Sequence, residues 1–203
     1  MTKPMLNANG RRGFTLTELA IVLLVAGAVV GAIWVAGGAV WSNYRIYRFS
    51  QQVITAVKNI RDQYANAVQL PAGPDITKTL DGLNLLPVEM RRDPSKPGNT
   101  EMDDPFNNDL PGGSFHVLVE APPTPPVFRI EAQGLTQEPC IKLLTLQPLA
   151  DAELGVVRIG TTTNSMAVAY NTATLPLPPS TAETWCGNAG NTNEVDWDFE
   201  VRN

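Results

Sequence analysis

A long uncharged segment near the N-terminus constrains the fold of this chain more than any other feature. The 26 residues from 19 to 44 carry no charged side chain and lie between Glu18 and Arg45. A helix needs about 20 apolar residues to cross a bilayer, so this segment is long enough to span a membrane. Glu18 therefore lies at the edge of a segment in which an unpaired carboxylate is costly.

The basic residues Lys3, Arg11 and Arg12 precede this segment, as in a secretory signal peptide. However, the apolar run exceeds the roughly 7–15 residues of a removable signal, and Ala36-Gly37-Gly38-Ala39 is only a weak cleavage site. We therefore predict a permanent anchor. The positive-inside rule then places the N-terminus in the cytoplasm and everything after Tyr44 outside it.

The residues around Gly13 resemble the start of type IV pilins and pseudopilins. The motif is Gly13-Phe14, followed by Thr15-Leu16-Thr17-Glu18-Leu19 and a long apolar helix. In that family a membrane peptidase cuts between the glycine and the aromatic residue, and the new amino terminus is methylated. The resemblance implies a leader over residues 1–13, cleavage between Gly13 and Phe14, and N-methylation of Phe14.

The resemblance also implies a role for Glu18 in assembly. In the family this glutamate meets the positive amino terminus of a neighbouring subunit as a new subunit enters the filament. Such a pair sets axial register, much as one buried polar group does in a coiled coil. The alternative, from the residues alone, is an acid that the helix dipole favours near a helix start.

The charge of the chain disfavours nucleic-acid binding. The formal net charge is −5, and removal of the leader with its three basic residues makes it −8. Binding to phosphates depends on Lys and Arg. We interpret the pairs Lys58/Arg61 and Arg91/Arg92 as solvated surface, and we expect no nucleic-acid partner.

Two cysteines, Cys140 and Cys186, lie in the part of the chain predicted to be outside the cytoplasm. A disulfide can persist there, and one that closes a loop of about 47 residues contributes about 4 kcal/mol on the chain-entropy model. The alternatives are two free core thiols or metal ligands. We expect no metal site, because His116 is the one further soft ligand and no CxxC spacing occurs.

A helical pattern continues beyond the apolar segment. Apolar side chains recur at steps of three or four, which indicates an amphipathic helix: Val53, Val57, Ile60, Tyr64 and Val68. Pro71 is expected to end it. The sequence thus predicts one helix over residues 14–70, with a membrane and assembly half (14–42) and an amphipathic half (43–70), before a globular domain (71–203).

The second half of the domain is predicted to form an antiparallel sheet. Segments 115–119 and 127–131 flank the prolines of residues 122–126, which predicts a hairpin. Further strands are expected at 155–159 and 165–170, a short helix at 140–149, and a surface loop at 175–181. In the last strand Val195, Trp197, Phe199 and Val201 alternate with acids, which predicts one packed face and one solvated acidic face.

An acidic cluster occupies the connecting region before these strands. It comprises Asp103, Asp104, Asn107, Asn108 and Asp109. Oxygen ligands at this density can hold calcium, but the EF-hand glycine is absent. We therefore expect a solvated acidic loop, with calcium binding as the alternative.

The C-terminal half resembles larger type IVb pilins, including conjugative thin-pilus subunits. The resemblance rests on residues 139–144, on Trp185-Cys186-Gly187-Asn188 and on the closing apolar strand. The 13-residue leader and Phe14 are instead typical of type IVa pilins and pseudopilins. The predicted fold class is α+β: a long N-terminal helix packed on an antiparallel β-sheet, as in the pilin fold, with a C-terminal disulfide.

No catalytic constellation is visible in the sequence. His116 has no serine or cysteine partner at a suggestive position, and no glycine-rich phosphate loop follows a strand. We therefore expect no enzyme and no cofactor.

The sequence predicts a structural subunit of a type IV pilus, a helical polymer of copies of itself. The implied partners are a prepilin peptidase and the assembly machinery of the bacterial inner membrane, where the subunit resides before it joins a fibre at the cell surface. One alternative is a minor pilin or a type II secretion pseudopilin. An alternative of another class is a membrane-anchored binding protein or adhesin that does not polymerise.

Overall fold

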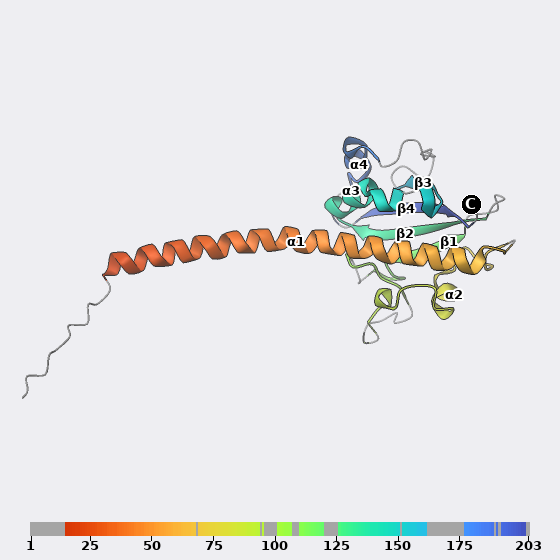
Figure 1. Cartoon of the computed structure of the whole chain (residues 1–203), viewed down its shortest axis with the longest axis horizontal. Helices are drawn as coiled ribbons and strands as arrows, with labels where there is room; N and C mark the ends of the chain where they lie inside the picture. The colour runs from red at the N-terminus through yellow and green to blue at the C-terminus, as the bar shows by residue number, and fades with distance from the viewer. Residues whose placement is uncertain are drawn as a thin grey trace, which may run out of the picture. The chain divides into compact units, whose positions relative to one another are not determined.

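The computed structural model describes residues 15–67, 69–93, 95, 101–106, 110–119, 126–150, 152–161, 177–188, 190 and 192–201. It divides the chain into two compact units, Met1–Trp41 and Ser42–Asn203. The elements in chain order are α1 (Leu16–Tyr64), α2 (Thr77–Gly82), η1 (Val88–Met90), β1 (Phe115–Val119), β2 (Val127–Leu135), α3 (Gln137–Thr145), η2 (Gln147–Ala150), η3 (Ala152–Leu154), β3 (Val156–Gly160), α4 (Pro179–Trp185) and β4 (Asn193–Glu200) (Figure 1).

In the first unit, α1 has no buried face. Leu16–Trp34 is a stretch of 19 residues that is long and apolar enough to cross a membrane, and none of it is buried inside the chain. Leu24 is 73% exposed and Trp34 83% exposed. A contiguous apolar surface of this size is unfavourable in water and is typical of a membrane or protein contact.

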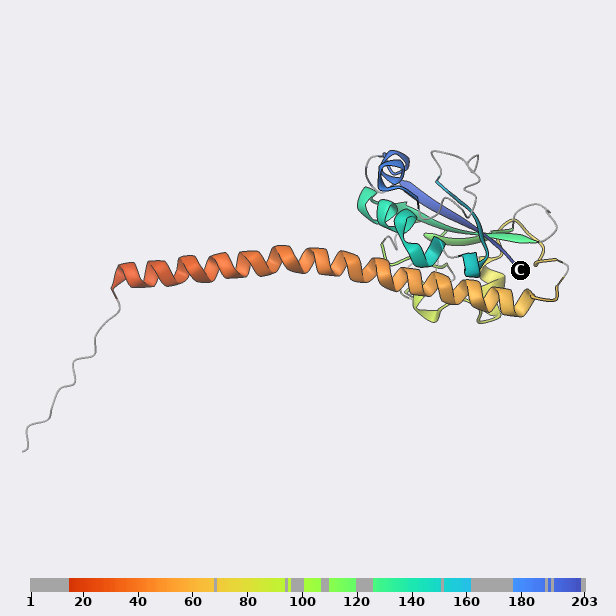
Figure 2. The same cartoon turned by 45° about the horizontal axis from the view of Figure 1, so that its top comes forward.

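In the second unit, the same helix has a buried stripe. It consists of side chains at helical spacing that are at most 4% exposed: Ile46, Phe49, Val53, Val57 and Ile60. The Phe49 ring lies 6.3 Å, centroid to centroid, from the rings of both Phe115 and Trp197, so the helix packs on the sheet (Figure 2). The predicted amphipathic helix on an antiparallel sheet is confirmed.

The helix ends at Tyr64, six residues before the end predicted at residue 70. Ala67 N–H donates to the Tyr64 carbonyl in a turn that leaves the helix axis. Pro71 also disfavours the helical conformation in the residue before it.

Within the described residues, four strands form one antiparallel sheet in the order β1-β2-β4-β3. β1 and β2 form the predicted hairpin, with Phe115 opposite Ala132 and Val119 opposite Phe128. β4 pairs with β2 on one side and β3 on the other, although it follows both in sequence. The α+β class is confirmed. The strand predicted at 165–170, and residues 122–125 of the proline-rich turn, lie outside the described residues.

The predicted solvated acidic face of β4 is wrong. Asp196 is only 4% exposed and Asp198 is fully buried. The reason is that β4 is a central strand, so its outer side chains have neighbours on two strands. Asp198 Oδ1 lies 3.0 Å from Arg129 Nε on β2, and its Oδ2 lies 2.6 Å from an Arg158 guanidinium nitrogen on β3.

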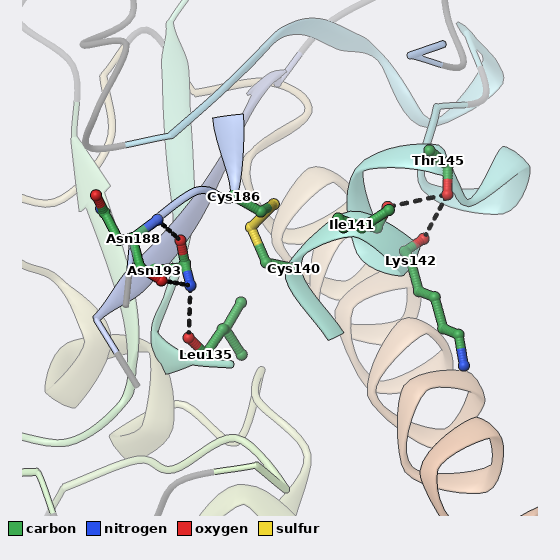
Figure 3. The surroundings of a disulfide bond; sticks show 8 residues. All are labelled: Leu135, Cys140, Ile141, Lys142, Thr145, Cys186, Asn188 and Asn193. Carbon is green, nitrogen blue, oxygen red and sulfur yellow. Dashed lines mark hydrogen bonds between the residues drawn. A yellow bond between two sulfur atoms is a disulfide. The ribbon is translucent and has the colours of Figure 1, made fainter. Parts of the chain in front are cut away.

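Two helices are joined by the predicted disulfide. Cys140 on α3 bonds to Cys186, directly after α4, and their Cα atoms are 5.9 Å apart (Figure 3). α4 occupies part of the segment predicted to be a surface loop. That prediction is wrong because Pro179 stands in the first turn of the helix, where the missing N–H of proline costs nothing.

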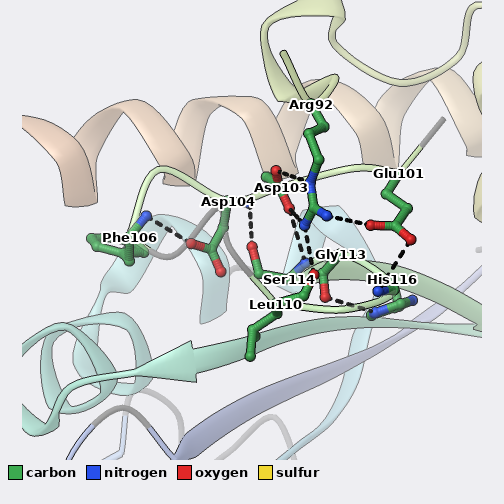
Figure 4. A network of polar contacts seen from close by, with 10 residues as sticks. Arg92, Glu101, Asp103, Asp104, Phe106, Leu110, Gly113, Ser114 and His116 are labelled. Atoms are coloured by element: carbon green, nitrogen blue, oxygen red, sulfur yellow. Dashed lines mark hydrogen bonds and ion pairs between the residues drawn. The ribbon is translucent and has the colours of Figure 1, made fainter. Parts of the chain in front are cut away.

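The connecting region is also more buried than predicted. Arg92 is 6% exposed and donates from Nε and a terminal nitrogen to the two Asp103 oxygens at 2.8 and 2.7 Å (Figure 4). The same guanidinium pairs with Glu101. The interpretations of Arg92 and Asp103 as solvated surface are therefore wrong, because each compensates the charge of the other. The guanidinium also occupies the side of Asp103 that a calcium ion would need. Residues 107–109 of the acidic cluster lie outside the described residues.

Candidate functional site

Thr15 and Glu18 form a capping box at the start of α1. Thr15 donates from its backbone N–H and from its hydroxyl to Glu18 Oε2, each at 2.9 Å. Glu18 N–H donates back to Thr15 Oγ1 at 3.3 Å. This reciprocal pair satisfies two of the backbone donors that a helix N-terminus leaves without partners. The Glu18 carboxylate thus has a structural role within a single chain.

Sequence reasoning missed this capping box. Its signature, a threonine followed three residues later by a glutamate and then an apolar run, stands in the sequence at Thr15 and Glu18. The cap and the predicted assembly role involve the same carboxylate. The predicted cleavage and methylation positions, Gly13 and Phe14, lie outside the described residues.

The helix around Glu18 offers a surface for close neighbours. Leu19 and Ile21, in the same stretch as Glu18, are 54% and 64% exposed. Gly27 and Gly31 stand one turn apart, and a Cβ added at either would meet nothing within 4 Å in this chain. Small residues at this spacing let membrane helices approach closely. The segment is therefore apolar and open to contact with other helices.

The disulfide is supported by a polar clamp at the end of the sheet. Asn193 donates from Nδ2 to the carbonyls of Leu135 and Asn188 at 3.1 and 3.2 Å (Figure 3). Asn188 N–H in turn donates to Asn193 Oδ1 at 3.2 Å. These bonds fix the segment after Cys186 against the end of β2. No sequence pattern pointed to Asn193.

His116 takes part in a local structural contact. Its Nδ1 lies 3.0 Å from Asp75 Oδ2 and its Nε2 lies 3.3 Å from the Gly113 carbonyl oxygen. Burial acts to raise the pKa of Asp75, but hydrogen bonds from Thr77 and His116 outweigh it and lower that pKa below its usual value. His116 thus stabilises the ionised Asp75.

Among known families, the model described as "Prokaryotic N-terminal methylation motif" matches residues 8–34. The chain carries this methylation motif. The matched range includes Gly13, Phe14 and Glu18, which are part of the motif that carries the sequence resemblance. The N-terminal segment is therefore type IV pilin-like.

The solved structures similar to this chain include two type IV pilins. The crystal structure of type IV b pilin from Salmonella typhi has 17% sequence identity and a TM-score of 0.48, covering 72% of this chain and 95% of that chain. The crystal structure of TcpA, a type IV pilin from Vibrio cholerae El Tor biotype, has 13% identity and a TM-score of 0.49, covering 76% and 98%. No curated protein matches the sequence.

Proposed function

We propose that the chain is a structural subunit of a type IV pilus, cleaved after Gly13 and polymerised through the N-terminal half of α1. One observation carries the proposal: a single carboxylate, Glu18, begins an exposed apolar helix that bears a methylation motif. Lipid covers this helix before assembly, and the same helices of neighbouring subunits cover it in the fibre.

The capping box explains how Glu18 is tolerated at the membrane before assembly. A carboxylate without hydrogen-bond partners is costly in an apolar medium. Thr15 supplies two donors, and both go to Oε2. A carboxylate has about four acceptor sites on its two oxygens, so Oε1 is available to the amino terminus of Phe14 on a neighbouring subunit. Assembly then adds a charge pair to a carboxylate that the cap already holds in place.

The proposed location follows from the charge and from the disulfide. The basic leader lies in the cytoplasm, and the domain lies beyond the inner membrane, where the Cys140–Cys186 bond persists. A prepilin peptidase removes the leader, and the assembly machinery of the inner membrane adds the subunit to a fibre at the cell surface. The chain acts as a building block and not as an enzyme.

Mass spectrometry of fibres sheared from cells tests this function. The expected subunit begins at Phe14, is heavier by one methyl group in place of a hydrogen, and holds Cys140 bonded to Cys186. A chain that stays in the membrane and begins at Met1, or one that begins beyond the apolar segment, would contradict the proposal.

The amount of subunit in the same material separates the related roles. A major pilin is the main component of the sheared fibre. A trace amount in a fibre made of another protein would instead assign the chain as a minor pilin or a pseudopilin. Absence from any fibre would favour an anchored binding protein.

A further inference from the structure

Three carboxylates gather where β2 and β4 pair. Glu131 on β2 lies opposite Asp196 on β4 in the antiparallel register. Glu194 lies two residues before Asp196, so it projects from the same side of β4. One carboxylate oxygen from each of these residues lies within 4.8 Å of the other two. This carboxylate cluster lies on the side of the sheet opposite Trp197 and is separate from the N-terminal segment.

The cluster contains a buried oxygen that lacks a protein partner. Asp196 is 4% exposed, and its Oδ1 is buried without a hydrogen bond. Glu131 is 9% exposed and accepts a bond from Gln133, whereas Glu194 is half-buried and connects the cluster to solvent. A buried polar atom without a partner is costly, more so when it is charged. A proton or a cation bound to Asp196 Oδ1 would remove this cost.

Charge around Asp196 is also unbalanced. The charged groups that act on it are the acidic Glu194, Glu131 and Asp198 and the basic Arg129. Both Arg129 and Arg158 are engaged by Asp198, at 3.0 and 2.6 Å. A divalent cation at the cluster would offset the negative charge that these acidic groups place around Asp196.

We propose that Glu131, Glu194 and Asp196 bind one divalent cation of the calcium type. Calcium takes oxygen ligands at about 2.3–2.6 Å, so ligands on opposite sides of the ion are about 4.6–5.2 Å apart. The oxygens of the cluster lie within 4.8 Å of one another, so they do not exceed the span that one calcium ion can bridge. Magnesium requires near-ideal octahedral geometry, whereas calcium accepts flexible geometry, so carboxylates fixed on two strands suit calcium better.

The ion would connect β2 to β4 beside the point where their register shifts, between Ala132 and Leu135. Its effect is therefore on the stability of the sheet. The site goes beyond the pilus function proposed above and does not depend on polymerisation. With three protein carboxylates and an opening to solvent, it belongs with extracellular modules that bind calcium at about 10⁻⁴–10⁻³ M.

Calcium titration of the full chain in detergent micelles, after treatment with a chelator, tests the site. The expected result is one calcium ion per chain by calorimetry and a melting temperature that rises with calcium concentration. Glu194→Gln should weaken the affinity at least about tenfold, since affinity follows the charge count of the ligands. Glu200→Gln is the matched control. Residue 200 lies on the same side of β4 but outside the cluster, so this variant should bind calcium as the wild type does.

Asp196→Asn keeps the test decisive if other variants fold poorly. It removes the buried ionisable carboxylate, so it should raise the melting temperature near neutral pH without calcium and abolish the response to calcium. The proposal is overturned if the wild type shows no calcium-dependent change up to about 10⁻² M, well above this affinity class. It is also overturned if Glu194→Gln and Asp196→Asn respond as strongly as the wild type does. A wild type that ignores calcium beside a stabilised Asp196→Asn would mean that Asp196 holds a proton instead.

Discussion

The two parts of α1 share one helical backbone but differ in what covers their apolar side chains. In residues 16–34 the large apolar groups are exposed, with Trp34 at 83%. In the part after residue 42, Phe49 and Val53 are fully buried against the domain of the same chain. The first part is apolar all round and the second has a single stripe, as expected for helices with different surroundings.

The two parts of α1 therefore have different roles. The second part stabilises the folded chain, because its stripe is removed from water on folding. The first part contributes no buried surface within a single chain, so its side chains act in lipid or in contacts with other copies. Changes in the two parts should therefore alter different measurements.

The largest expected effect comes from Glu18→Val. It removes the carboxylate proposed to meet the neighbouring amino terminus, so sheared fibre should fall to background while the unfolding free energy of the domain stays unchanged. The measurement pairs fibre yield with denaturant unfolding. Thr15→Val is the matched control, because it loses the cap hydroxyl but keeps the carboxylate, and it should retain more fibre. Normal fibre from Glu18→Val would show that the charge is not needed.

Phe49→Ala should destabilise the domain, because it removes a side chain with which the second part of α1 packs on the sheet. Its ring contacts Phe106, Phe115 and Trp197 in the core, and loss of a buried phenylalanine costs about 3–5 kcal/mol. Trp34→Ala is the control in the first part, and it should leave the unfolding free energy unchanged. Equal losses in the two variants would mean that the first part is also packed within the chain.

Arg92→Met tests charge burial within the domain. It leaves the Asp103 carboxylate buried without its guanidinium, and removal of one partner of a buried ion pair costs about 3–5 kcal/mol. The adjacent Arg91→Met breaks only an exposed pair with Asp81, worth about 0–1 kcal/mol. Urea unfolding of both variants measures the difference. Similar values would place Arg92 at the surface after all.

A pH dependence of stability in calcium-free buffer is the smallest expected change when it is expressed per pH unit. Burial, together with Glu194 and Glu131, raises the pKa of Asp196 from 3.8 to about 8. The folded chain then keeps a proton that the unfolded chain loses, so this group lowers stability as pH rises from about 4 to about 8. The slope is at most about 1.4 kcal/mol per pH unit. Melting temperatures of the wild type and Asp196→Asn, measured across this range, should diverge; parallel curves would contradict the raised pKa.

Local patterns in the sequence predicted most of the fold. Burial imposes a characteristic spacing of apolar residues on a helix or a strand. This spacing predicted the stripe from Val53 to Ile60, the hairpin of β1 and β2, and the packed face of β4. The pair Cys140 and Cys186 followed from the count of cysteines and the side of the membrane. These features depend on neighbours in sequence or on a single pair.

The sequence did not reveal which polar side chains would be buried. From the sequence alone, Asp198 is expected to be solvated, because its partners Arg129 and Arg158 are distant in sequence. The three side chains meet only because β4 lies between β2 and β3. Arg92 likewise depends on a contact across the connecting region with Asp103. Strand order in a sheet is a global property, and alternation along one strand does not specify it. The capping box at Thr15 is different, since its local signature was present and was overlooked.

The central position of β4 determines the order in which the domain can be completed. β1, β2 and β3 are all synthesised before the strand that joins the hairpin to β3. The β1–β2 hairpin is local and can form early, whereas pairing across β4 closes long loops and is slow. During synthesis, the domain thus exposes an open edge of β2 until residues 193–200 arrive. That edge has to be protected from pairing with other chains while the domain is incomplete. In the finished fold β4 covers it, so the need for protection cannot be seen there.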